Sequence, residues 1–389
     1  MNIRVFLNNE IVILLLIFWY IEPAYFQQIS AVNNIYNFGR VCFLCFGLLL
    51  YFLFKKNKNY SYDLIVILFL WIIFTTFLHN GNLSELSYEL LCAGGLCTYI
   101  ALYTEFNSIK ILVVIYKLLY IFIVINLICM FIFPHGMYTS MGGDGVTVYW
   151  QNWFLGYKNY PIRIFIPALV LGHLLCRFGK KKNTLIILYV ICFVSSILLD
   201  SSTGLIGIFV FSALAFCILH LNTIKKIINL KTAVIFTIII FYVVIIAQSQ
   251  NSILAYITNF FGKDLTFSGR ISIWHDSITA ILQSFLTGHG QFSGSDFQNI
   301  TGSFAFHPHN YFLYVLFRGG VIELLIIALF VGSIFFSIKR QPNLYRLACV
   351  YTISMFLMGI TESLITTAVL FYPVFLFFNL IESYESHVA

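Results

Sequence analysis

Charged residues are scarce in this 389-residue chain. They make up 10% of it, whereas hydrophobic residues make up 60%. A soluble domain carries about 25% charged residues. A soluble fold of this length has too little interior to hide so many apolar side chains. The scarcity of charge therefore excludes a soluble globular protein, and it predicts that lipid solvates much of the chain.

Acidic residues are fewer than basic ones, and the formal net charge is +7. A basic surface is typical of nucleic-acid binding. Here, however, the lysines and arginines form short runs between apolar segments, where they orient a membrane protein. We therefore expect membrane lipid, and no nucleic acid, as a partner.

Two other signals are missing. Cys42 and Cys45 are spaced like a redox or zinc pair but lack a second pair and nearby histidines, and nearly all nine cysteines fall in apolar segments. We expect them to be packing residues. The first apolar stretch, residues 11–21, ends in Glu22-Pro23 without a small-residue cleavage site. It is therefore expected to be a retained first span.

Apolar segments long enough to cross a membrane recur along the whole chain. A spanning helix needs about 20 mostly apolar residues. The sequence predicts an all-α protein of about twelve such helices, forming a single integral membrane domain over residues 1–389. Their centres lie near residues 13, 46, 70, 97, 122, 169, 191, 212, 239, 325, 353 and 372.

Basic residues predict the orientation of these helices. With both termini in the cytoplasm, every basic run falls on the cytoplasmic side, including Lys55-Lys56, Lys180–Lys182 and Lys339-Arg340. The opposite side holds a few isolated cations, among them Arg163, Arg270 and Arg318. The pattern predicts an even number of spans with both ends cytoplasmic.

Two predicted outer segments are long, residues 134–160 and 248–309. Long loops above a membrane scaffold are usually functional. No internal repeat is visible in the sequence. Inverted repeats would have favoured a transporter.

The larger outer segment contains an amphipathic pattern. Apolar residues recur at three- and four-residue steps from Ile271 to Phe285, with Ser268 as a candidate N-cap. We expect this helix to lie along the outer interface, with Trp274 at headgroup depth. Arg270 would fall in its first turn, where a cation is unfavourable unless an anion is bound. The alternatives are a phosphate clamp and an arginine that reaches lipid headgroups.

A histidine pair, His307 and His309, precedes the tenth predicted span, and Asn310 follows directly. Histidine is suited to proton transfer near neutral pH. A structural role at the interface is the alternative. The pair lacks a third residue with ligand-like spacing, so we expect no metal.

Arg318 and Glu323 place two charges inside an apolar span, beside Gly319 and Gly320. Ionisable residues there are costly, which makes them functional candidates. An ion pair between them is the structural alternative. Their five-residue spacing is poor for a pair within one helix, so we expect each to have other partners.

Three stretches resemble the O-antigen ligase and polymerase superfamily, which includes the Wzy-type polysaccharide polymerases. Residues 268–274 are similar to its S-G-R-x-x-x-W box, and Leu286–Gly290 look like its glycine pair. His309-Asn310, followed after nine residues by Gly320, look like its H-N-x9-G signature. The motifs occur in the family's order and at the corresponding place in the topology.

The resemblance implies a metal-independent, inverting glycosyltransferase with the all-helical GT-C type of fold and no cofactor. The donor would be an oligosaccharide on polyprenyl diphosphate, polymerised at the outer face of a bacterial cytoplasmic membrane into a capsule or O-antigen type polysaccharide. His309 would activate the acceptor hydroxyl, and Arg270 would bind the diphosphate. Asn310, Arg318, Glu323 and His307 would support them. A chain-length regulator and a flippase are further expected partners.

The chain departs from the family at two positions. Ser202 stands where a second arginine is expected, and Glu323 stands where the signature ends in glycine. Arg163, at the outer mouth of the sixth predicted span, is the candidate substitute for the missing arginine. Aromatic residues of the first outer loop, among them Trp150 and Trp153, could stack on sugar rings or form an interfacial belt.

Other functions compete with polymerisation. A ligase that moves the lipid-linked glycan to another acceptor would use the same residues. A lipid-glycan flippase or other transporter should carry charges near the middle of several spans, where Arg318 and Glu323 stand nearly alone. A non-enzymatic scaffold would leave His309 and Arg270 without a role.

Overall fold

The computed structural model describes residues 3–56, 59–141, 149–179, 182–220, 229–246, 270–362 and 370–388. Most of these residues are helical. The helices are α1 (Ile3–Leu7), α2 (Glu10–Ile17), η1 (Phe18–Tyr20), α3 (Ala24–Gln27), α4 (Ser30–Phe54), α5 (Tyr60–Leu78), α6 (Leu83–Glu89), η2 (Leu90–Gly94), α7 (Gly95–Glu105), α8 (Lys110–Ile132), α9 (Ile162–Cys176), α10 (Lys182–Leu198), α11 (Ser202–His220), α13 (Leu230–Phe241), η3 (Tyr242–Ile246), α15 (Arg270–Gln283), α16 (Gly294–Thr301), α17 (Tyr311–Ser337), η4 (Ile338–Arg340), α18 (Pro342–Thr361) and α19 (Phe371–Val388).

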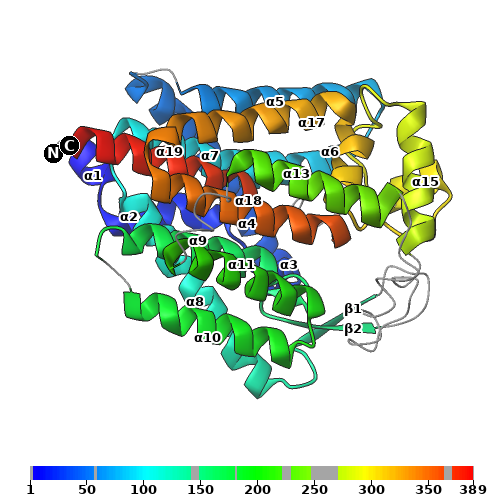
Figure 1. Cartoon of the computed structure of the whole chain (residues 1–389), viewed down its shortest axis with the longest axis horizontal. Coiled ribbons are helices and arrows are strands. Elements are labelled where there is room, and N and C mark those ends of the chain that lie inside the picture. The colour runs from blue at the N-terminus through cyan, green and yellow to red at the C-terminus, as the bar shows by residue number, and fades with distance from the viewer. Residues whose placement is uncertain are drawn as a thin grey trace.

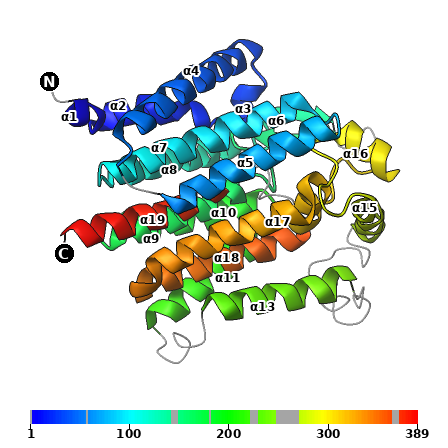
Figure 2. The ribbon, with the colours of Figure 1, turned by 90° about the horizontal axis from the view of Figure 1, so that it is seen from above.

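The long helices lie side by side in a bundle (Figure 1). Both termini lie at one end of the bundle, and α15 lies across the opposite end, where α16 is also found (Figure 2). We call the second of these the α15 end. Termini at the same end agree with the predicted even number of spans.

All twelve predicted span centres fall within described helices. Among the described residues, six helical segments are long and apolar enough to cross a membrane: residues Ser30–Phe54, Tyr60–Leu78, Leu83–Glu105, Lys110–Ile132, Tyr311–Arg340 and Pro342–Ile360. This confirms a membrane protein with several spans. Other apolar helices, such as Ile162–Cys176, are shorter than the about 20 residues of a typical span. Twelve spans therefore remain a prediction.

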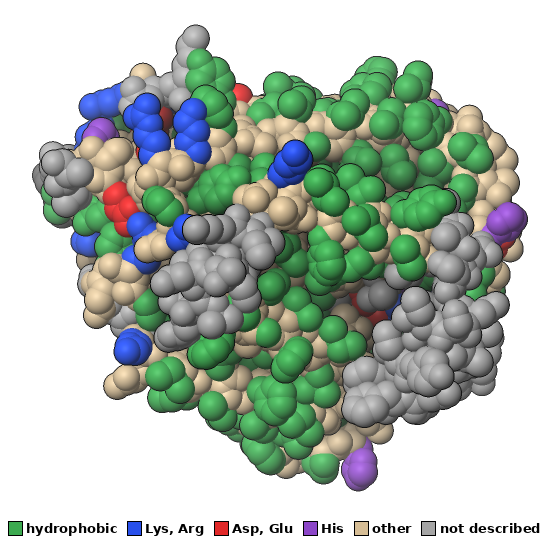
Figure 3. Space-filling view, viewed as in Figure 1, with side chains coloured by type: hydrophobic (Ala, Val, Ile, Leu, Met, Phe, Trp, Pro, Cys, Tyr) green, Lys and Arg blue, Asp and Glu red, His purple; other side chains and the backbone are tan. Residues whose placement is uncertain are grey.

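Charge is distributed unevenly over the bundle surface. Lysines and arginines gather at the end that holds the termini, and hydrophobic side chains cover much of the middle (Figure 3). Exposed apolar residues of α5 and α17, among them Leu70, Phe74, Leu325 and Leu329, belong to this middle region. The distribution is the one that a lipid-embedded bundle requires.

Residues 134–160, predicted as a long outer loop, include in their described part three short strands, β1 (Tyr138–Met141), β2 (Tyr149–Trp153) and β3 (Gly156–Tyr157). They pair antiparallel in the order β1-β2-β3. The strands lie in a segment that was predicted as a loop, where strand pairing satisfies backbone groups, and most of the described residues are helical, as predicted. Trp153 is buried and donates its indole N–H to the carbonyl of Phe133 at 2.8 Å. It is therefore a packing residue and not an open stacking platform, whereas Trp150 stacks on Tyr157.

Candidate active site

One carboxylate at the α15 end joins the two residues on which the sequence interpretation depends. Nη2 of Arg270 donates to Oε1 of Glu362 at 2.7 Å. Nδ1 of His309 lies 3.7 Å from Oε2 of the same carboxylate. The Glu362 side chain is 8% exposed, whereas Arg270 and His309 are 20% and 26% exposed. Arg270 and His309 are therefore reachable from solvent, while the carboxylate of Glu362 is buried.

The local sequence explains how His309 reaches this place. Asn310 is the N-cap of α17, where its side chain accepts a hydrogen bond from the backbone N–H of Leu313 at 2.9 Å. The same side chain donates to the carbonyl of Ile360 at 2.7 Å. It thereby holds the start of α17 against the end of α18, two residues before Glu362. His309 has a left-handed backbone, with φ 49°, a conformation that costs free energy for a non-glycine residue.

Burial and nearby charges determine the ionisation states of Glu362 and His307. Burial raises the pKa of the Glu362 carboxyl, but Arg270 and His309 outweigh burial and hold this pKa at about 2. Burial, together with the charges of His309, Arg270 and Arg163, lowers the pKa of His307 to about 3. At neutral pH, Glu362 is therefore a carboxylate and His307 is a neutral imidazole.

His307 supports its neighbour directly. Its Nδ1 accepts a hydrogen bond from the backbone N–H of His309 at 3.2 Å, and the two ring centroids lie 4.0 Å apart. The contact needs an unprotonated Nδ1, which agrees with the lowered pKa of His307. His307 therefore helps to hold the strained backbone of His309.

The start of α9 reaches the same carboxylate. Asn159 donates to Oε1 of Glu362 at 3.2 Å and accepts a hydrogen bond from Ser201 at 2.9 Å. Arg163 lies over the ring of Tyr160, 3.8 Å from its centroid, and its charge acts on His307. Asn159 thus connects Ser201 to the site. Ser201 is next to the position where the family carries a second arginine, and in this chain Arg163 supplies a second cation nearby.

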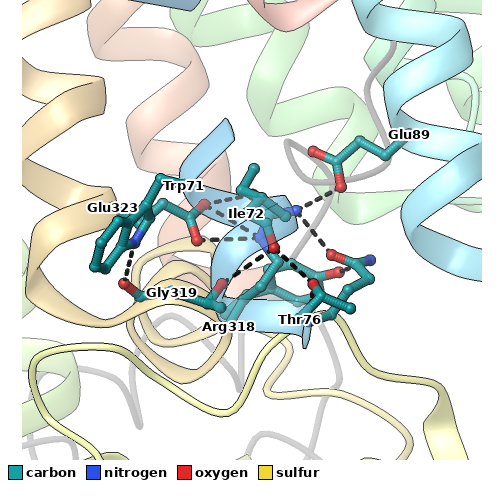
Figure 4. Close-up of polar contacts among 10 residues, drawn as sticks. Trp71, Ile72, Thr76, Glu89, Arg318, Gly319 and Glu323 are labelled. Carbon is teal, nitrogen blue, oxygen red and sulfur yellow. Dashed lines mark hydrogen bonds and ion pairs between the residues drawn. The ribbon is translucent and has the colours of Figure 1, made fainter. Parts of the chain in front are cut away.

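Arg318 forms a separate buried cluster inside the bundle (Figure 4). It donates to Glu323 through Nε and Nη2, and to Glu89 of α6 at 2.5 Å. The prediction that Arg318 and Glu323 do not pair within the helix is wrong. Gly320 breaks α17 between them, with φ 67° and ψ −167°, and the break brings side chains five residues apart together. Glu89 and Gln291 are additional partners of Arg318 that the sequence did not reveal.

Gly288 and Gly320, two glycines of the family motifs, let the segment around residues 286–290 pack against this break. A Cβ on Gly288 would lie 2.4 Å from the carbonyl oxygen of Arg318, and a Cβ on Gly320 would lie 2.2 Å from that of Leu286. The backbone N–H groups of His289 and Gly290 donate to the carbonyls of Phe317 and Arg318 at 2.7 and 2.8 Å. Gly288 and Gly320 therefore allow the segment around residues 286–290 to pack directly on α17, at the helix break that follows His309 in the chain.

The predicted amphipathic helix is present as α15, but part of its apolar face packs against protein. Trp274 is 2% exposed and packs with Phe297 and Phe317 in a core cluster. Leu282 and Phe285 are exposed instead. Protein therefore covers Trp274, which an apolar face alone does not reveal, and its depth in the membrane stays a prediction. Ser268, the candidate N-cap, lies outside the described residues.

Sequence reasoning missed Glu362 and Asn159. Glu362 is an acidic residue directly after an apolar span at the predicted outer side, and that position was the available signal. Its partners are 53 and 92 positions away in the chain, so no local spacing links them. Among the described residues, no three His, Cys, Asp or Glu side chains are grouped so that they could hold a metal ion.

The fold and the site together define a multi-span membrane protein with a charged, partly open site at one end of its helix bundle. Residues 187–328 match the model of the O-antigen ligase family. This match confirms the resemblance to the O-antigen ligase and polymerase superfamily, and it includes Arg270, His309 and Arg318. Arg163 and Glu362 lie outside the matched residues. No curated protein matches the chain.

Proposed function

We propose that this protein transfers an oligosaccharide from polyprenyl diphosphate to the hydroxyl of an acceptor sugar, at the outer face of a bacterial cytoplasmic membrane. The observation that carries the proposal is the shared contact of Arg270 and His309 with Glu362, at the end of the bundle opposite the termini. A hollow with acidic and basic side chains at its floor opens at this end (Figure 3). The O-antigen ligase match supports transfer of lipid-linked glycans.

The reaction forms one bond and breaks one. The acceptor oxygen attacks the anomeric carbon, and the bond from that carbon to the diphosphate breaks on the opposite face, which inverts the configuration. His309 accepts the proton of the acceptor hydroxyl at Nε2, since Nδ1 faces Glu362. The Glu362 carboxylate stabilises the imidazolium that forms, as the aspartate does in a serine-protease triad.

Arg270 stabilises the leaving diphosphate. A guanidinium binds phosphate oxygens bidentately, and the Arg270 side chain is 20% exposed at this end of the bundle. Arg163 adds positive charge from α9. With two arginines to balance the leaving group, the proposed chemistry needs no metal ion. Chelation with EDTA should then leave the activity of the purified protein unchanged, and a loss restored only by divalent ions would contradict this mechanism.

Polymerisation is the first form of the proposal: both substrates are lipid-linked, and the product is a longer chain on polyprenyl diphosphate. The test is to supply the purified protein in nanodiscs with lipid-linked repeat units alone and to separate the products by size. A ladder of products supports a polymerase. Products that appear only after another acceptor is added indicate a ligase. Movement of intact lipid-linked units across a vesicle membrane without any new glycosidic bond would indicate a flippase.

A further inference from the structure

A cleft of about 490 Å³ opens between α6, the start of α16 and the segment before α17. These elements meet at the α15 end of the bundle (Figure 2). Phe306 is 41% exposed on its wall, and Phe292 and Tyr314 line it as buried rings. The exposed carboxylate of Glu85 and the imidazole of His307 also face this cleft. The cleft therefore combines apolar ring surface with hydrogen-bonding groups.

The cleft adjoins the candidate active site through His307. His307 lines it and lies against His309, with ring centroids 4.0 Å apart. Glu362 instead faces Nδ1 of His309, and Arg270 pairs with Glu362. A molecule in the cleft and a diphosphate at Arg270 would thus reach His309 by way of different residues.

The residues that line the cleft indicate which class of ligand it binds. An anion is disfavoured because Glu85 would repel it. A lipid tail is disfavoured because Glu85, His307 and two serines of the α16 start interrupt the apolar wall. A sugar ring fits both features, since its C–H face packs on an aromatic ring and its hydroxyls donate to a carboxylate.

We propose that this cleft, lined by Phe306, Glu85 and His307, binds the sugar of the acceptor glycan that is attacked next. Glu85 is a binding residue for sugar hydroxyls, and Phe306 is the stacking platform. The inference rests on the proposed glycosyl transfer, because an acceptor site has meaning only for that reaction.

The wall of the cleft is fixed before any ligand arrives. The backbone N–H of Asn82 donates to the carbonyl of Gln291 at 2.6 Å, which ties the start of α6 to the start of the α16 segment. Ser293 and Asp296 form a capping box at α16. Gly294 packs directly on Phe306, where an added Cβ would lie 2.8 Å from Cβ of Phe306. Such preorganisation lowers the entropic cost of binding.

The binding test uses the full chain in nanodiscs and a fluorescently labelled oligosaccharide without lipid, released from the host's own surface polysaccharide. Fluorescence anisotropy gives its Kd. Phe306→Ala and Glu85→Gln should each raise the Kd about tenfold. Phe304→Ala is the matched control, because Phe304 is 49% exposed two residues away and does not line the cleft. It should change the Kd by less than about twofold.

Transfer kinetics provide the second measurement. Phe306→Ala and Glu85→Gln should raise the KM for the acceptor and leave the KM for the lipid-linked donor unchanged. Absence of wild-type binding, wild-type Kd values in both variants, or an equal loss in Phe304→Ala would overturn the inference. If the wild type transfers no sugar at all, the proposed function fails, while the binding measurement still decides whether the cleft holds a glycan.

Discussion

Arg270 and Glu362 form a 2.7 Å ion pair although 92 positions separate them in the chain. The pair joins the first turn of α15 to the end of α18, and His309 lies against the same carboxylate. A cation in the first turn of a helix is unfavourable, and Glu362 offsets this cost. The pair therefore holds a guanidinium ready beside the proposed base.

Glu362→Gln tests whether this carboxylate takes part in the reaction. The amide keeps the shape but cannot stabilise an imidazolium, so transfer should slow roughly 10²- to 10⁴-fold. Single-turnover transfer with lipid-linked substrate measures the effect. Glu382→Gln is a control, because Glu382 lines a different cleft, with Asn59 and Ser337. Equal rates for Glu362→Gln and the wild type would remove Glu362 from the mechanism.

Gly288 packs against α17 and Gly302 has open space around it, so alanine should lower the stability more at position 288 than at position 302. Gly288 and Gly302 both have left-handed backbones, with φ 65° and 70°. Alanine at either position should cost about 1 kcal/mol for the backbone alone. Gly288→Ala should cost a further 1–3 kcal/mol, roughly, since its Cβ meets the Arg318 carbonyl, whereas Gly302 has open space. Thermal unfolding in detergent compares them, and equal melting temperatures would contradict the docking.

The buried cluster at Arg318 should be far more sensitive than a surface ion pair. Arg318→Met leaves Glu89 and Glu323 without their cation, which should cost roughly 3–5 kcal/mol of stability. Arg177→Met is the matched control, because the Arg177–Glu385 pair is 25% and 27% exposed and should contribute less than about 1 kcal/mol. Both are measured by thermal unfolding. A loss of the same size in the two variants would argue against burial of the Arg318 cluster.

His307 predicts how stability depends on pH. Its pKa is about 3 in the folded protein against an ordinary value of 6.5. As the pH falls through 6.5, the unfolded chain takes up a proton that the folded protein does not, so stability falls. His307→Gln should reduce the drop in melting temperature between pH 7.5 and pH 5. An unchanged drop would show that His307 is not held neutral.

Sequence patterns predicted the features that depend on nearby residues. Apolar length located the helices, and it placed Asn310 directly before the tenth predicted span, where α17 begins. The contacts that complete the site were not predictable in this way. Glu362 approaches His309 and Arg270 only through tertiary packing, and the Arg318–Glu323 pair depends on the helix break at Gly320. Periodicity identified the amphipathic helix, but it could not show that Trp274 faces protein.

The proposed role of His309 is open to the most direct test. His309→Ala and His309→Asn, the second of which tolerates the left-handed backbone at this position, are compared with the wild type in nanodiscs with lipid-linked repeat units. Both variants should keep the fold, measured by thermal unfolding, and should form no products longer than the supplied repeat unit. Products of normal length from either folded variant would exclude His309 as the base and contradict the central claim.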